Sequence, residues 1–291
     1  MSTPYDTAAI IGVGLLGGSL GLALKARNLA DTVLGVGHRA ASIDAALEIG
    51  AIDEGFMDAR EACRDADLII LCTPAALVAP KVDEIFPVLR PNALITDVAS
   101  TKADICAHAA RHWPKPLRFV GSHPMAGSEK WGPEHSSASL YEGCYTIVTP
   151  QPDQDPEALD AIHALWEDLG AAVVTCSPEQ HDALVARTSH VPHIVSAALA
   201  VLAANSDRPA DVRPFIGKGF ADTTRIAAGR PEIWRDICLT NRSAILNSLD
   251  SLLDQLQTVR DLIGEEAGDD LEDFFTAGQQ ARDELLEDGA I

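Results

Sequence analysis

The first half of the chain alternates short apolar runs with stretches in which apolar residues recur at helical spacing. The apolar runs are residues 8–13, 33–36, 68–72, 93–98, 118–120, 145–148 and 171–175. The helical repeat is found between them, for example in residues 18–27, 40–48 and 157–169. Nearly continuous apolar strands that alternate with helices are typical of a parallel sheet covered on both faces. The pattern predicts a Rossmann-type, doubly wound α/β domain over residues 1–177.

The strand pattern ends near residue 177, and only helical stretches follow. Residues 181–204 are predicted to form a helix that is bent or broken at Pro192. A much longer helix is predicted to start near Pro231 and to continue to about Leu262, and a third covers residues 270–286. Broad apolar faces on such helices must be buried. We therefore expect residues 178–291 to form an all-α domain that packs partly on a second copy of the chain, giving a homodimer.

Composition and charge narrow the class of protein. With 291 residues, 47% of them hydrophobic, the chain is long enough for two domains with proper cores. The net charge of −21 argues against nucleic acid or an anionic membrane surface as a partner. No apolar run approaches the roughly 18 residues of a membrane span, and no secretion signal precedes Tyr5. The six cysteines are scattered without a C-x-x-C pair, so we expect reduced thiols and a cytoplasmic protein.

A glycine pattern follows the first predicted strand. Gly12, Gly14 and Gly17 form G-x-G-x-x-G, with Leu15 and Leu16 between the second and third glycines. In a strand–turn–helix context these glycines permit a tight turn, a close approach of the backbone to a pyrophosphate, and close packing of helix on strand. The alternative is a glycine-rich turn in an unrelated α/β fold. We favour a dinucleotide site whose phosphates sit at the amino end of the helix.

The choice between NAD and NADP depends on the end of the second strand. A carboxylate there normally binds the ribose of NAD, but this chain has His38 and Arg39 instead. Arg39 suits the 2′-phosphate of NADP, which is slightly favoured; a surface arginine with NAD bound without the carboxylate is the alternative. Thr73 and Pro74 end another strand at the same rim, where they either contact the cofactor or form an ordinary turn.

The loop after the strand at 118–120 carries the strongest chemical signal. His123 lies in a segment bounded by glycine and proline, and its imidazole can accept a proton from a substrate hydroxyl near neutral pH. Ser100 follows the strand at 93–98 and is expected at the same edge of the sheet. Ser100 either caps the helix that begins near Lys102, or hydrogen-bonds His123 or the substrate.

The helical half adds two further groups of polar residues. His190 and His193 are three residues apart, but no third ligand with suitable spacing is evident, so we expect no metal site. Asp222 and Arg225 are also one helical turn apart. Arg225 either pairs with Asp222 or makes a bidentate grip on a substrate carboxylate.

Five motifs in this order resemble the prephenate/arogenate dehydrogenase family of tyrosine biosynthesis, which includes the cyclohexadienyl dehydrogenases. They are Gly12-x-Gly14-x-x-Gly17, Asp97-x-x-Ser100-x-Lys102, Gly121-Ser-His123-Pro-Met-Ala-Gly127-Ser-Glu129, Ser189-His190-x-Pro192-His193 and Gly219-Phe220-x-Asp222-x-Thr224-Arg225-Ile226. The resemblance implies a nucleotide-binding domain, a helical dimerisation domain, and an active site in the cleft between them. It also implies oxidative decarboxylation of prephenate or arogenate, with hydride transfer to NAD or NADP.

The resemblance assigns roles to individual residues. It implies that His123 is the catalytic histidine at the ring hydroxyl, Ser100 helps to position it, Arg225 grips a substrate carboxylate, His193 lies near the substrate side chain, Glu129 gates that end, and Trp234 completes the site from the neighbouring subunit. With no further segment evident, we expect neither a chorismate mutase nor a regulatory domain.

Two alternatives remain at this point. A β-hydroxyacid or 6-phosphogluconate-type dehydrogenase also joins a nucleotide domain to helices, but usually relies on a lysine in the helical half, where this chain has only Lys218. Lys218 also interrupts a glycine run that is often continuous in the resembled family. A non-catalytic module that senses the redox state of the dinucleotide is the second alternative.

Overall fold

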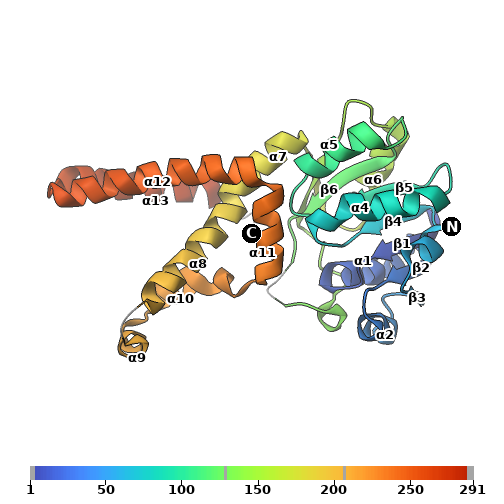
Figure 1. The fold of residues 1–291 in the computed structure, drawn as a ribbon, viewed down its shortest axis with the longest axis horizontal. Coiled ribbons are helices and arrows are strands. Elements are labelled where there is room, and N and C mark those ends of the chain that lie inside the picture. The colour runs from blue at the N-terminus through green and yellow to red at the C-terminus, as the bar shows by residue number, and fades with distance from the viewer. Residues whose placement is uncertain (1–3, 128–129, 206–207, 287–291) are drawn as a thin grey trace. The chain divides into compact units, whose positions relative to one another are not determined.

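The computed structural model describes residues 4–127, 130–205 and 208–286 (Figure 1). The chain divides into two compact units, Met1–Arg242 and Ser243–Ile291. The first unit contains the whole sheet and all the residues predicted to form the site.

The described residues form one eight-stranded sheet in the order β3-β2-β1-β4-β5-β6-β7-β8. The strands are β1 (Tyr5–Ile11), β2 (Ala30–Val36), β3 (Glu54–Phe56), β4 (Leu68–Leu71), β5 (Leu94–Asp97), β6 (Phe119–Pro124), β7 (Tyr145–Thr149) and β8 (Ala172–Thr175). The first six are parallel, β7 runs antiparallel to β6, and β8 is parallel to β7. The parallel α/β prediction is confirmed. The apolar pattern missed β3 because that strand is three residues long and only partly buried.

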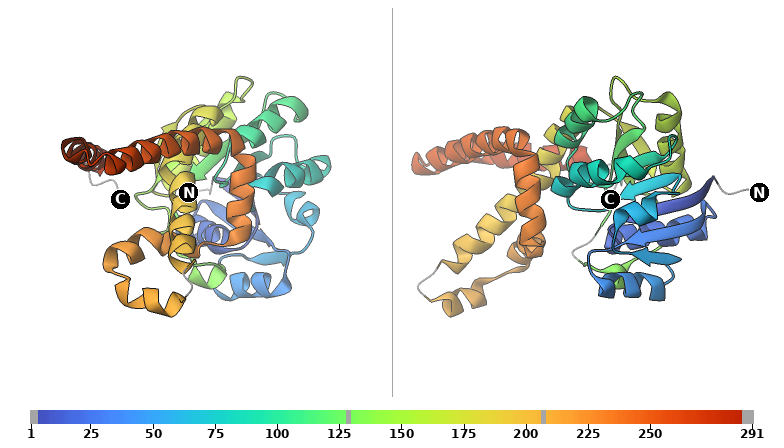
Figure 2. Two further views of the ribbon diagram at one scale, coloured as in Figure 1. Left: turned by 60° about the vertical axis from the view of Figure 1, so that its left-hand side comes forward. Right: turned by 45° about the vertical axis from the view of Figure 1, so that its right-hand side comes forward.

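Helices lie on both faces of the sheet (Figure 2), and alternation along the strands creates one core on each face. In β1, Ala8 and Ile10 pack on one face, and Ala9 and Ile11 pack on the other. Helices α1 (Leu15–Ala26), α2 (Ala40–Glu48) and α6 (Pro156–Asp168) cover the first face. Helices α3 (Ala59–Cys63), α4 (Ala75–Ile85) and α5 (Ala103–His112) cover the second. Burial on both faces explains why β4 is apolar at every position and why β1 is apolar from Ala8 to Ile11.

Short helices and a long helical stretch complete the first unit. The α-helices are α7 (Pro178–Val185), α8 (Val191–Ala204), α9 (Pro209–Val212), α10 (Lys218–Thr224) and α11 (Pro231–Thr240), and the 3₁₀ turns are Phe86–Val88, Pro133–His135, Arg213–Phe215 and Arg225–Ala228. Between α7 and α8 the chain stays helical through a π-helical turn, Ala186–His190. This turn precedes Pro192, which has no N–H to donate to a carbonyl of the preceding turn, so the expected irregularity takes the form of a π-turn.

The prediction of one long helix from Pro231 is wrong. Helix α11 ends at Thr240, and α12 (Arg242–Gly264) starts anew after Asn241. The backbone of Asn241 leaves the helical region, with φ −114° and ψ 34°. Its side-chain amide donates to the carbonyl oxygen of Asp182, 2.8 Å away. A long-range hydrogen bond therefore fixes the interruption, although the apolar repeat continues across it.

The second unit consists of α12 and α13 (Gly268–Leu286), joined by a turn in which Glu266 adopts a left-handed φ of 54°. The third predicted helix thus begins two residues earlier than expected. Several large apolar side chains of this unit are more than half exposed in the single chain, namely Leu253, Leu256, Ile263 and Phe275. None of the described helices combines the length and the hydropathy that a membrane span requires.

A buried ion pair joins the end of β5 to the start of α5. The side chains of Lys102 and Asp97 are both fully buried, and Lys102 Nζ contacts Asp97 Oδ2. The same carboxylate accepts the backbone N–H groups of Ser122, at 3.1 Å, and Ala99, at 3.0 Å. Each charge is therefore compensated inside the protein, which a buried charge requires.

We expect Lys102→Met to lower the free energy of unfolding by about 3–5 kcal/mol, because it leaves the Asp97 charge buried without its partner. The matched control is Lys25→Met, since Lys25 and Asp53 form an ion pair with side chains 34% and 37% exposed. Loss of such a surface pair costs less than about 1 kcal/mol. Urea unfolding of both variants measures the difference; equal losses would contradict a special contribution of the buried pair.

Candidate active site

The glycine pattern occupies the turn between β1 and α1, and two of its glycines cannot carry a side chain there. Gly12 has a φ of +106°, and a Cβ at this position would lie 2.4 Å from the carbonyl oxygen of Cys72. A Cβ on Gly17 would lie 2.0 Å from the carbonyl oxygen of Gly12. The tight turn and the close packing of helix on strand are thus both present. Gly14 is the N-cap of α1 and makes no side-chain cap, so the first N–H groups of the helix, at Leu15 and Leu16, are suited to phosphate oxygens.

The residues that follow β2 lie at the same edge of the sheet as this turn. The backbone N–H of Gly12 donates to the carbonyl oxygen of Val36, the last residue of β2, at 2.8 Å. His38 and Arg39 follow after Gly37 and are exposed, and Arg39 is the N-cap residue of α2. The positive end of α2 and the Arg39 side chain offer donors at this place, and neither residue is an acid.

Thr73 and Pro74 occupy the corresponding place after β4. The Oγ1 atom of Thr73 is buried and has no hydrogen-bond partner among the described residues. Pro74 is the N-cap residue of α4. An unsatisfied hydroxyl beside the glycine turn, together with the open amino end of α1, fits a bound dinucleotide.

His123 lies near the carboxyl end of β6, where it pairs with Ile147 of β7. Its side chain is 9% exposed, and its Nδ1 is 2.9 Å from Nε2 of His181 in α7. The two rings meet edge to face, with centroids 5.1 Å apart. Nε2 of His123 is hydrogen-bonded to none of the residues that the structure describes. The imidazole is held by one nitrogen and presents the other.

Asp182 holds His181 and caps α5 at the same time. Its Oδ1 is 2.7 Å from His181 Nδ1 and accepts the backbone N–H of Lys102 at 2.8 Å. Its Oδ2 accepts the N–H of Ala103 at 2.9 Å. The alternative in which Ser100 caps this helix is therefore not realised: Asp182, 80 residues beyond Lys102, satisfies the first turn of α5. Ser100 is half-buried and makes no hydrogen bond to His123 within the described residues.

The surroundings of His123 keep it neutral. Burial lowers its pKa well below the ordinary value of 6.5, and His181, Lys102 and His190 act in the same direction. A neutral imidazole is the form that accepts a proton. The site therefore presents a base near physiological pH.

A second group of rings lies beside this chain of polar contacts. The side-chain amide of Asn241 is 3.1 Å from Nδ1 of His190, whose Nε2 is buried and has no partner among the described residues. The His193 ring stacks on Trp234, with centroids 3.6 Å apart and an angle of 25°. Its Nδ1 is 2.9 Å from the carbonyl oxygen of Ser189, which leaves Nε2 as an acceptor. Trp234 thus has a place beside His193 in its own chain.

Arg225 begins the 3₁₀ turn after α10 and is exposed. In the part of the chain that is described, it forms no ion pair with Asp222, so the simple pairing alternative is not realised. The charge of Arg225 lowers the pKa of His193, although burial of that ring has the larger effect. Glu129 lies outside the described residues.

Sequence reasoning did not assign the supporting residues. His181 and Asp182 were visible as an adjacent pair after the predicted boundary, but nothing in their spacing connects them to His123. Asn241 fell inside a predicted helix. His181 contacts His123, 58 residues away; Asp182 contacts Lys102, 80 residues away; and Asn241 contacts Asp182, 59 residues away.

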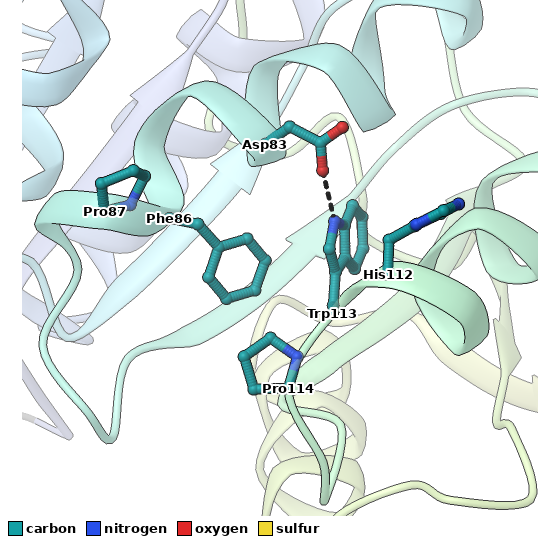
Figure 3. A pocket seen from close by; sticks show the side chains of 6 residues that line it. All are labelled: Asp83, Phe86, Pro87, His112, Trp113 and Pro114. Carbon is teal, nitrogen blue, oxygen red and sulfur yellow. Dashed lines mark hydrogen bonds between the residues drawn. The ribbon is translucent and has the colours of Figure 1, made fainter.

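A separate pocket lies at the other end of α5 (Figure 3). It is lined by Asp83, Phe86, Pro87, His112, Trp113 and Pro114. The indole N–H of Trp113 donates to Asp83 at 2.7 Å, which satisfies the buried ring nitrogen. Because α5 has ten residues, about 15 Å of helix separates this pocket from the Asp182 cap. We do not include it in the candidate site.

Both halves of the chain match known families. Residues 20–175 match the nucleotide-binding domain of prephenate dehydrogenase, and residues 177–277 match the dimerization domain of prephenate dehydrogenase. The chain is 33% identical over 295 residues to a prephenate dehydrogenase of Bacillus subtilis (strain 168), covering 100% of this chain and 80% of that enzyme. It is 31% identical over 292 residues to a cyclohexadienyl dehydrogenase of Zymomonas mobilis, covering 99% of each.

Solved structures agree with these matches. A prephenate dehydrogenase from A. aeolicus, in complex with hydroxyphenyl propionate and NAD+, superposes with a TM-score of 0.90 at 32% identity, covering 96% of this chain and 98% of that one. An arogenate dehydrogenase from Synechocystis has a TM-score of 0.81 at 31% identity, with coverage of 96% and 99%.

We expect the stability of the protein to fall in acid partly because of His190. Burial lowers its pKa from 6.5 to about 4. Between these values the unfolded chain binds a proton that the folded state does not, so the free energy of unfolding declines as the pH falls from 6.5 to 4. The full difference amounts to about 3 kcal/mol. Urea unfolding between pH 7 and pH 4 should show a shallower decline for His190→Asn than for the wild type. The exposed His135→Asn serves as control; parallel declines in all three proteins would contradict this contribution.

Proposed function

The chain belongs to the prephenate dehydrogenase family, and from this premise we propose that it catalyses the oxidative decarboxylation of prephenate or arogenate with hydride transfer to a nicotinamide dinucleotide. The observation that carries the proposal is the buried, neutral imidazole of His123. His181 occupies its Nδ1 side, so Nε2 remains for a substrate hydroxyl. The carboxyl ends of the parallel strands place this imidazole at the same edge of the sheet as the glycine turn.

The reaction requires one base and accurate orientation. His123 Nε2 accepts the proton of the ring hydroxyl while a hydride leaves the ring carbon that bears this hydroxyl. The opposite ring carbon loses its carboxylate as carbon dioxide, and the new phenolate takes the proton back from His123. The bound oxidised nicotinamide supplies the hydride acceptor. Because the ring becomes aromatic, the protein residues have mainly to orient the reactants and begin the deprotonation.

Four residues are proposed to bind the substrate around this base. Arg225 grips a carboxylate through its planar guanidinium group, which suits bidentate binding. His193, stacked on Trp234, lies at the side-chain end of the substrate. Glu129 is proposed to gate that end. Ser100 helps to position the ring hydroxyl between His123 and the cofactor.

The glycine turn and the residues after β2 are proposed to bind the cofactor. The N–H groups of Leu15 and Leu16 bind the pyrophosphate, with Thr73 and Pro74 at the same rim. The exposed cation Arg39 beside His38, with no acid after β2, slightly favours NADP over NAD. The fit of the glycine turn is common to both cofactors.

We propose that the enzyme is a homodimer, with residues 1–177 and 178–291 as its two functional domains. The match to a dimerization domain and the exposed apolar residues of α12 and α13 support this assembly. A cytoplasmic location is proposed because all six cysteines are free thiols. Lys218 lies exposed at the start of α10, and no observation favours it as a catalytic lysine of the β-hydroxyacid type.

Initial rates of nicotinamide reduction, with prephenate and arogenate each paired with NAD and NADP, test the reaction. We expect turnover in at least one of the four combinations. His123→Asn should lower kcat by roughly 10²–10⁴-fold while cofactor binding is kept, because the variant loses the general base. Folded, cofactor-binding wild type that is silent in all four combinations would overturn the function; near-normal kcat in the variant would remove His123 from it.

The cofactor preference has its own test in Arg39→Ala. Loss of a charged hydrogen bond to a phosphate costs about 1.5–3 kcal/mol, or roughly 10–100-fold in affinity. We expect the KM for NADP to rise by that factor and the KM for NAD to stay within roughly threefold. Arg64→Ala removes another exposed arginine of the same domain and is the control. Equal effects of Arg39→Ala on both cofactors would contradict a 2′-phosphate contact.

A further inference from the structure

We propose that Asp182 and His181 are positioning residues of the reaction: together they fix the protons on both imidazoles so that His123 Nε2 is a free base, and they share the proton that His123 takes up. This inference rests on the proposed function. It concerns two residues that are not among those proposed above to bind the substrate or the cofactor.

The hydrogen-bond directions follow from the carboxylate. Asp182 accepts the N–H groups of Lys102 and Ala103 through both oxygens, as an ionised carboxylate does. His181 Nδ1, 2.7 Å from Oδ1, must therefore be the donor. A neutral imidazole has one N–H, so His181 Nε2 is an acceptor.

The same argument determines the position of the hydrogen on the His123 ring. His181 Nε2 lies 2.9 Å from His123 Nδ1, and since it accepts, His123 Nδ1 must carry the hydrogen. His123 Nε2 then bears the lone pair that faces the substrate. If the hydrogen bonds ran in the opposite direction, with a donor at position 182, a hydrogen would lie on His123 Nε2 and the imidazole could not act as a base.

The hydrogen-bonded residues Asp182, His181 and His123 also stabilise the positive charge that arises when His123 takes up the substrate proton. When His123 Nε2 takes the substrate proton, the Nδ1–H bond of His123 breaks and an N–H bond forms on His181 Nε2; no electrons are transferred. The resulting imidazolium lies against the Asp182 carboxylate. Sharing the charge in this way avoids leaving a buried cation on His123 alone.

The other groups around the chain do not supply this compensation. Lys102 is paired with Asp97, and His190 is held neutral beside Asn241. Cys106 and Cys176 are free thiols whose pKa values burial raises. Asp182 is therefore the anionic group that remains to balance a proton on the two imidazoles.

The first test is Asp182→Asn, with kcat followed across pH. Replacing the carboxylate removes the charge that stabilises the protonated pair, so the acidic limb of the kcat profile should move to lower pH. It also permits hydrogen bonds in the opposite direction, so the plateau of kcat should fall roughly 10²-fold with little change in KM. A proportional loss of kcat at every pH, with the limb unmoved, would mean a structural role only and would overturn the proposal.

Asp155→Asn is the matched control. Asp155 is the N-cap residue of α6, accepting the N–H of Glu157 at 3.0 Å, and it pairs with Arg118; among the described residues no imidazole is hydrogen-bonded to it. The acidic limb of the pH profile of kcat should not move in Asp155→Asn. A shift as large as that of Asp182→Asn would show that helix capping alone explains the effect.

A pair of substitutions at His181 tests the acceptor. His181→Gln retains an amide oxygen that can accept from His123 Nδ1, so kcat should stay within roughly tenfold of the wild type. His181→Leu leaves that N–H without an acceptor, and kcat should fall roughly 10²-fold. Equal kcat values in the two variants would contradict the proposed chain.

A readout without turnover separates this proposal from the proposed function. In ¹⁵N-histidine NMR of the full chain, with His123→Asn used for assignment, His123 should be protonated at Nδ1 and unprotonated at Nε2. The opposite tautomer would overturn the positioning role even in an active enzyme. The expected tautomer in a protein silent with all four substrate pairs would overturn only the function.

Discussion

Asp182 determines much of the local structure, because its carboxylate and its backbone carbonyl together satisfy donors from three places at once. The carboxylate oxygens accept the first N–H groups of α5 and the Nδ1–H of His181, and the backbone carbonyl of the same residue receives the Asn241 amide. Helix α5 carries no cap of its own. Without this carboxylate, the first turn of α5 and the His181 ring would each lose a buried partner, which is costly in a low-dielectric interior.

The neutral state of His123 depends on how the charges around it are arranged. The Lys102 ammonium, placed close enough to lower the pKa of His123, is itself neutralised by Asp97. Asp97 also fixes the backbone of Ser122, the residue before His123. The same buried pair therefore helps to position the imidazole, whereas burial is the main reason that the pKa of His123 is low. Fully satisfied polar networks of this kind specify one geometry, whereas a partly satisfied one would be destabilising.

The cofactor edge follows a different constraint, which is steric. At Gly12 and Gly17 a single added carbon would overlap a carbonyl oxygen, so the turn depends on the absence of side chains. In the proposed function, chemistry and cofactor binding rely on separate parts of the same sheet edge: backbone shape on the β1 side and side-chain charge on the β5–β6 side. The family to which the chain belongs joins a nucleotide-binding domain to a dimerization domain.

The sequence by itself determined the alternation of strands and helices, the glycine turn and the candidate base, because periodicity and backbone restriction are local properties. It did not reveal β3, whose three residues are too few and too exposed to make a pattern. Nor did it reveal the cap of α5: Ser100 was one candidate from the sequence, whereas in the fold Asp182 accepts the first N–H groups of this helix. Only the tertiary structure decided that the helix after Pro231 stops at Asn241 and that His181 supports His123. The reason is that these hydrogen bonds join residues more than fifty positions apart, and such contacts leave no periodic trace in the chain.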